Sequence, residues 1–146
     1  MPPDSNASLP EDGFSELLDL RFAADPLAVG AIADTIDSTL IQTHVVEQKR
    51  MEIGLAVQEA LANAVVHGCK KDPSKEVRCR LKMDGRGRIL IIVTDPGAGF
   101  NPDALADPIH SDNILADHGR GVYLIRQVMD EVQFEMGGKQ IRMMKY

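Results

Sequence analysis

Apolar and polar residues alternate in two stretches of the chain, and this two-residue period is typical of a strand with one buried face. The first stretch is residues 18–22, LDLRF, and the second is residues 77–83, VRCRLKM. A continuous apolar run follows at residues 89–93, ILIIV, and predicts a central strand that is covered on both faces. Asp84-Gly85-Arg86-Gly87 between the last two stretches predicts a hairpin turn. A final hairpin is predicted over residues 132–143, around Gly137-Gly138.

Apolar residues at spacings of three and four predict three helices. The first extends to about Thr43, with Asp25-Pro26 supplying a cap and a proline at the first helical position. The second covers about residues 46–68 and ends at Gly68, since glycine suits a C-terminal stop. The third covers residues 121–130. Residues 96–120 are predicted to be loop-like.

The order of these elements is strand, helix, helix, strand, strand, loop, helix, strand, strand. Because hairpins dominate, we expect a mixed, mainly antiparallel sheet with helices on one face, an α/β (α+β) two-layer sandwich. A doubly wound parallel sheet would need a helix between nearly every pair of strands. With 146 residues, the chain fits a single domain. We expect that domain at residues 15–146, after a disordered leader at residues 1–14.

Composition narrows the choice of partners and compartment. A net charge of −6 argues against direct nucleic-acid binding, because phosphate backbones select basic faces. No run of 18 apolar residues predicts a membrane span, and the first 13 residues lack the Lys or Arg of a secretory signal. The two cysteines have no C-x-x-C spacing, so we expect unpaired thiols in a reducing compartment. The sequence therefore predicts a cytoplasmic location.

The first motif that could carry catalytic or ligand-binding residues is EALANAVVHG, residues 59–68. Glu59 and Asn63 are four residues apart and project from the same helix face. Alanines surround them and leave room for a ligand against the helix. Taken alone, the pair is more typical of a solvated polar face.

The second motif, Asp95-Pro96-Gly97-Ala98-Gly99, directly follows the most apolar strand. A carboxylate at the end of a buried strand needs a hydrogen-bond donor, and the amino group of adenine is suitable. Gly97 and Gly99 would let a flat base approach the backbone. A plain strand-ending turn is the alternative. A dinucleotide fold is excluded because Pro102 occupies the expected third glycine position, and no Walker phosphate loop is present.

The third motif, His118-Gly119-Arg120-Gly121, leads into the predicted third helix. Backbone N–H groups at a helix start bind anions, and the helix dipole strengthens that binding. A triphosphate would fit here, although glycines also start helices without any ligand.

Together the three motifs resemble the GHKL (histidine-kinase-like) ATPase superfamily, and within it the anti-sigma-factor serine/threonine-protein kinases of bacterial partner-switching systems. The resemblance covers residues 15–146 and implies the histidine-kinase-like ATPase fold with ATP and Mg²⁺ as cofactors. It implies that Asn63 ligates Mg²⁺, that Glu59 is the catalytic base and that Asp95 binds the adenine amino group. Gly97 and Gly99 would shape the base site, and Gly119, Arg120 and Gly121 would hold phosphates beneath a lid of about residues 103–118.

Two positions depart from the pattern of the superfamily. The third motif has only Gly119 and Gly121, where many members carry a longer glycine run. The last hairpin reads Gly138-Lys139-Gln140, where members often place a threonine near the adenine. Asp95 is therefore expected to lack a supporting hydroxyl.

The resemblance predicts a kinase that phosphorylates an anti-anti-sigma-type antagonist on serine or threonine and regulates a sigma factor or similar target. It also suggests a homodimer formed near the first strand and helix. The alternative is a non-catalytic module that sequesters its target and uses ATP only as a structural ligand. A gyrase or chaperone ATPase fragment is disfavoured, because those proteins carry transducer domains that the sequence does not show.

Overall fold

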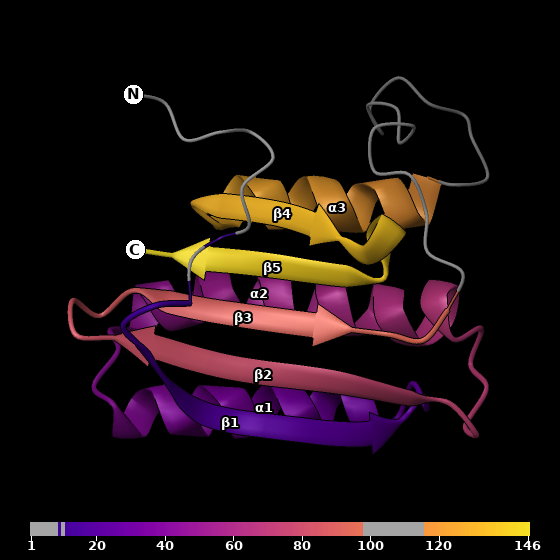
Figure 1. Cartoon of the computed structure of the whole chain (residues 1–146), viewed down its shortest axis with the longest axis horizontal. Coiled ribbons are helices and arrows are strands. Elements are labelled where there is room, and N and C mark those ends of the chain that lie inside the picture. The colour runs from indigo at the N-terminus through magenta and orange to yellow at the C-terminus, as the bar shows by residue number, and fades with distance from the viewer. Residues whose placement is uncertain (1–8, 10, 98–115) are drawn as a thin grey trace.

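The computed structural model describes residue 9 and residues 11–97 and 116–146, with the backbone alone at residues 116–119. The described elements follow the predicted order (Figure 1). They are β1 (Phe14–Ala23), α1 (Ala28–Gln42), α2 (Glu47–Asn63), the π-helical turn η1 (Ala64–Gly68), β2 (Glu76–Asp84), β3 (Ile89–Thr94), α3 (Ala116–Val128), β4 (Glu131–Glu135), the 3₁₀ turn η3 (Met136–Gly138) and β5 (Gln140–Lys145).

The strands form one five-stranded sheet in the order β1-β2-β3-β5-β4. Every strand pairing in the described part of the chain is antiparallel, and the three α-helices lie on the same face of the sheet (Figure 1). The predicted two-layer sandwich is therefore confirmed. The apolar run of β3 occupies the central strand, as its composition predicted.

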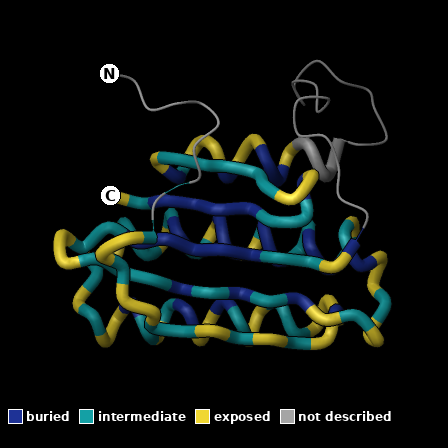
Figure 2. The backbone as a smooth tube through the Cα atoms, viewed as in Figure 1, coloured by how far each residue is buried: buried dark blue, intermediate teal, exposed yellow. Residues whose placement is uncertain are grey.

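The main core lies between the helices and the sheet. Ile91 of β3 packs there with Ile53 and Leu61 of α2 and Ile125 of α3, and all four side chains are fully buried. Figure 2 shows that burial is greatest along β3 and β5 and lower along the edge strands β1 and β4. α2 lies over the centre of the sheet (Figure 1). Its polar residues Glu59 and Asn63, near the C-terminal end of the helix, therefore lie close to the well-packed core.

Two element boundaries differ from the sequence-based expectation. α1 begins at Ala28 rather than at Pro26, because Pro26 and Leu27 form a tight turn in which the Asp25 carboxylate accepts the Leu27 N–H at 3.0 Å. The prediction of a loop up to residue 120 is wrong at its end, since α3 already begins at Ala116. Two glycines in this stretch lower helix propensity, but packing of α3 against α2 overrides them.

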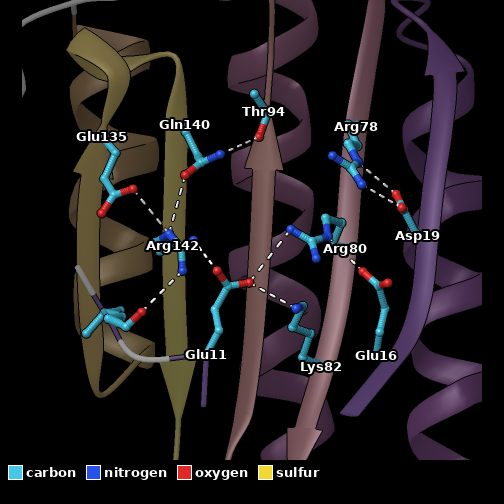
Figure 3. A network of polar contacts seen from close by, with 11 residues as sticks. Glu11, Glu16, Asp19, Arg78, Arg80, Lys82, Thr94, Glu135, Gln140 and Arg142 are labelled. Carbon is cyan, nitrogen blue, oxygen red and sulfur yellow. Dashed lines mark hydrogen bonds and ion pairs between the residues drawn. The ribbon is translucent and has the colours of Figure 1, made fainter. Parts of the chain in front are cut away.

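The helix-free face of the sheet is covered in part by the chain before β1. Leu9 and Phe14 pack over a second small cluster of Leu90, Ile92 and Met144. The Glu11 carboxylate binds Arg142 Nη2 at 2.8 Å and Lys82 Nζ at 2.9 Å (Figure 3). The expected leader covered residues 1–14, yet β1 begins at Phe14 and Glu11 is held against the sheet. Residues 1–8 and 10 lie outside the described residues.

None of the helices in the described part of the chain combines the length and apolar content that a membrane span requires. The two cysteines are free and buried, as expected. Burial raises the pKa of the Cys79 thiol to about 12, so this side chain serves as an apolar core residue.

Candidate active site

The polar pair of α2 meets the first turns of α3. Glu59 and Asn63 are both half-buried on α2, and Gly121 of α3 lies directly against them. A Cβ atom at Gly121 would lie 2.9 Å from Glu59 Oε2 and 3.0 Å from Asn63 Nδ2. The structure thus brings together residues from two motifs that are far apart in the sequence, and a side chain at position 121 would displace the Glu59 carboxylate.

After Asn63 the helix changes from α to π. The Cys69 N–H donates to the Ala64 carbonyl at 2.8 Å, a five-residue spacing that defines the π-helical turn η1. Such turns occur frequently at functional sites. η1 joins Asn63 at one end to Gly68 at the other, so one short turn links the two parts of the site.

Asp95 follows β3 and points to the helix-covered side of the sheet. The preceding Thr94 points to the other side, where its hydroxyl accepts the Gln140 Nε2 hydrogen bond at 2.9 Å (Figure 3). The Asp95 N–H donates to the Lys139 carbonyl at 2.9 Å, and the Gly97 N–H donates to Asp95 Oδ1 at 2.8 Å. The backbone of the last hairpin and of the glycine turn therefore fixes this aspartate.

Burial raises the pKa of the Asp95 carboxyl, while the Gly97 N–H and the charges of Lys139 and Lys75 lower it. The carboxylate has lost part of its hydration and gains from any further donor that reaches it. An exocyclic amino group of a purine supplies such a donor, because a carboxylate only accepts hydrogen bonds.

The predicted site residues fall into two groups. Glu59, Asn63 and Gly121 form one group, and Asp95 and Gly97 form the other. Gly99, and the predicted lid except for its last residues 116–118 in α3, lie outside the described residues.

The glycines of the third motif lie inside α3. The helix begins at Ala116, so Gly119, Arg120 and Gly121 do not precede it as expected. The unpaired amides of a helix are those of its first turn, and Gly121 lies beyond them. In this structure the contribution of Gly121 is close approach to α2.

Gly68 is a site residue that the sequence analysis did not assign. A Cβ atom there would lie 2.5 Å from Asp95 Oδ1 and 2.6 Å from Oδ2. Gly68 was expected only as a helix stop, and the helix does end there. The residues with positive φ that follow are Lys70 and Lys71, at 53° and 58°. A glycine at a helix end is indistinguishable from a cap in the sequence, so only the tertiary contact identifies its role.

A metal ion held here would need ligands other than a cluster of His, Cys, Asp or Glu side chains from the described residues. Among the described residues no group of three His, Cys, Asp or Glu side chains could hold a metal. The carboxamide oxygen of Asn63 is suited to Mg²⁺, which usually takes few protein ligands and completes its shell with water and phosphate oxygens.

Comparison with protein families matches residues 22–145 to the histidine kinase-like ATPase domain. The chain belongs to the histidine kinase-like ATPase domain family. This confirms the family predicted from the three motifs.

Relatives of this histidine kinase-like ATPase domain include proteins named serine-protein kinase RsbW. That of Bacillus subtilis (strain 168) is 30% identical over 139 residues, covering 90% of this chain and 86% of the relative. That of Staphylococcus epidermidis is 29% identical over 140 residues, covering 90% and 87%. The fold is similar to the histidine kinase domain from Erythrobacter litoralis EL346 blue-light activated histidine kinase, with a TM-score of 0.51 at 21% identity over 80% of this chain and 60% of that one.

Proposed function

We propose that this histidine kinase-like ATPase domain is a protein serine/threonine kinase that uses ATP. The observation that carries the proposal is the contact of Gly121 with both Glu59 and Asn63, which sets a carboxylate and a carboxamide side by side. Relatives of similar length that are named serine-protein kinases support it. Phosphoryl transfer depends mainly on positioning and charge stabilisation, so few side chains suffice.

In this proposal Glu59 is the catalytic base. Its carboxylate accepts the proton of a serine or threonine hydroxyl while that oxygen attacks the γ-phosphorus and the bond to ADP breaks. Asn63 holds Mg²⁺ through its side-chain oxygen, and the ion when bound neutralises charge on the phosphates. Gly121 lies against the same pair, and in this proposal Gly119, Arg120 and Gly121 hold the phosphates.

The base of ATP lies at the other group of residues. Asp95 accepts a hydrogen bond from the adenine amino group, and Gly97 and Gly99 shape the turn against the ring. Partial burial of the Asp95 carboxylate supports this role, because a partly desolvated acceptor discriminates between a donor and an acceptor on the base.

The protein substrate in this proposal is an anti-anti-sigma-type antagonist in the cytoplasm, and the regulated target is a sigma factor or similar protein. The domain acts as a homodimer formed near β1 and α1. Among the described strands β1 lies at one edge of the sheet, which is compatible with such an interface.

Transfer of labelled phosphate from ATP tests the proposal, with candidate antagonist domains from the same genome as acceptors. The wild type is expected to form phosphoserine or phosphothreonine. Glu59→Gln should lower transfer by about 100-fold or more, the scale of general base catalysis, and keep ATP affinity. Glu47→Gln changes an exposed carboxylate at the start of the same helix and is the control.

Two results would contradict the assignment. Full transfer by Glu59→Gln would mean that another group is the base. ATP binding by the wild type with no transfer to any antagonist would favour the sequestering module instead.

A further inference from the structure

Gly68 lies at the junction of η1 with the Asp95 turn, and its missing side chain leaves the space that the Asp95 carboxylate fills. The three atoms nearest to a Cβ built on Gly68 all belong to that carboxylate. The backbone of Gly68 does not have the positive φ that favours glycine. Glycine is therefore required here for space and not for conformation.

Gly97 packs against the backbone of Gly68 at the same contact. A Cβ atom at Gly97 would lie 2.7 Å from the Gly68 carbonyl carbon and 2.8 Å from Asp95 Oδ1. Since the Gly97 N–H also donates to Asp95 Oδ1, both glycines adjoin the carboxylate. The space left by the missing Gly68 side chain and the Gly97 N–H are the two features that adjoin this carboxylate.

We propose that Gly68 is a positioning residue that holds the Asp95 carboxylate at the place where it selects the purine base. This inference rests on the proposed function, because it assumes that Asp95 recognises adenine. A methyl group at position 68 would push the carboxylate away from η1 and from the Gly97 N–H. Asn63 and Glu59 would keep their contacts with Gly121, because both residues precede η1.

Isothermal titration calorimetry of Gly68→Ala with ATP and GTP, each with Mg²⁺, tests the inference. We expect ATP affinity to fall about tenfold or more, as for loss of one charged hydrogen bond, and the preference for ATP over GTP to fall with it. Dependence on Mg²⁺ should remain. A general structural defect would weaken both nucleotides equally and leave their ratio unchanged.

Gly54→Ala is the matched control. Gly54 lies in α2, and no atom is found within 4 Å of a Cβ built there. Alanine is the better helix former at either position, so Gly54→Ala should raise the thermal unfolding midpoint and leave nucleotide affinity unchanged. In Gly68→Ala the clash with Asp95 opposes that gain.

The double variant Gly68→Ala/Asp95→Ala tests the contact between these two residues by thermal unfolding, without any nucleotide. Removing the carboxylate removes the three atoms that the added methyl group meets, so the Gly68→Ala substitution should lower the midpoint in the wild type and not in Asp95→Ala. If Gly68→Ala does not fold, recovery of folding in the double variant supports the inference, and failure to recover overturns it.

Wild-type affinity and wild-type ATP preference in Gly68→Ala would also overturn the inference. If the wild type itself bound no ATP, the proposed function would fail instead. The unfolding midpoints of the wild type, Gly68→Ala, Asp95→Ala and the double variant would still report whether Gly68 sets the position of Asp95.

Discussion

The two faces of β3 are buried by different means. Ile91 and its neighbours at alternate positions pack under the helices in the large core, while Leu90 and Ile92 lie under Leu9 and Phe14 on the helix-free face. Side chains one residue apart in the same strand are equally buried. Equal burial of two residues therefore does not show that they are covered by equally extensive packing.

Charged side chains surround the small apolar cluster on the helix-free face. Arg142 is nearly buried between Glu11 and Glu135, at 2.8 and 3.3 Å, and Arg78 forms a two-point contact with Asp19 at 2.6 and 2.8 Å (Figure 3). Exposed ion pairs contribute little to stability. Pairs that connect neighbouring strands, however, favour one register over its alternatives.

The candidate site belongs to the helix-covered face. Asp95 continues the alternation of Ile91 and Val93 past the end of β3 and so reaches η1. The helix-covered face of the sheet thus positions the polar residues of the site, and the opposite face is joined by ion pairs to the segment before β1. Four experiments test this contrast, from the largest expected effect to the smallest.

Ile91→Ala and Ile92→Ala compare the two faces directly. Both remove the same atoms from a buried position, but the cost of a cavity depends on how far its surroundings can collapse. We expect a loss of about 3–5 kcal/mol in the free energy of unfolding for Ile91→Ala and about 2 kcal/mol for Ile92→Ala. Denaturant unfolding measures both. Equal losses would show that the segment before β1 is packed as firmly as the helices.

Asp95→Asn tests the site at the end of the helix-covered face. Replacing the carboxylate by an amide should weaken ATP binding by about 1.5–3 kcal/mol, the range for a hydrogen bond with a charged partner. Calorimetry with ATP and GTP measures the loss, and Asp34→Asn on the exposed side of α1 is the control. If the wild type binds ATP and GTP equally, Asp95 does not read the base.

Glu11→Gln tests the helix-free face. Hydrogen bonds from Arg142 and Lys82 lower the pKa of the Glu11 carboxyl from 4.5 to about 2. A lowered folded-state pKa gives stability that is fully present above the unfolded value, near 4.5, and is lost as the pH falls towards 2. Because the side chain is about one-third exposed, screening leaves about 1–2 kcal/mol at neutral pH.

Unfolding of the wild type and of Glu11→Gln at a series of pH values gives the comparison. The difference between them should shrink between pH 4.5 and 2. A difference that stays constant over that range would mean that the charge of Glu11 does not contribute. Glu47→Gln provides a matched exposed carboxylate.

The Arg78–Asp19 pair should have the smallest effect. It links β1 and β2 by two short hydrogen bonds, which lower the pKa of Asp19, but both side chains are about one-third exposed. A double-mutant cycle with Arg78→Ala and Asp19→Ala should give a small favourable coupling that decreases in high salt. Coupling that is insensitive to salt would show that the packing of the guanidinium contributes more than its charge.

Most of the fold could be predicted from the chain, because periodicity reports which face of an element is buried. The alternation at residues 77–83 and the apolar run at residues 89–93 gave β2 and β3 within a residue or two. The start of α3 could not be predicted, because Gly119 and Gly121 disfavour a helix locally. Packing of Val122 and Ile125 compensates for them. Glu11 was not recognised as part of the fold because its cations lie on β2 and β5.

The sequence by itself determined the order of the elements, the two-layer architecture and the family, since these depend on local periodicity and on short motifs with fixed residue types. Only the tertiary structure decided that Gly121 meets Glu59 and Asn63 and that Gly68 meets the Asp95 carboxylate. Those contacts join residues on different elements, and their distances depend on how helices and strands pack. The role of a glycine such as Gly68 or Gly121 can be assigned only when the side chain that occupies the space beside it is known.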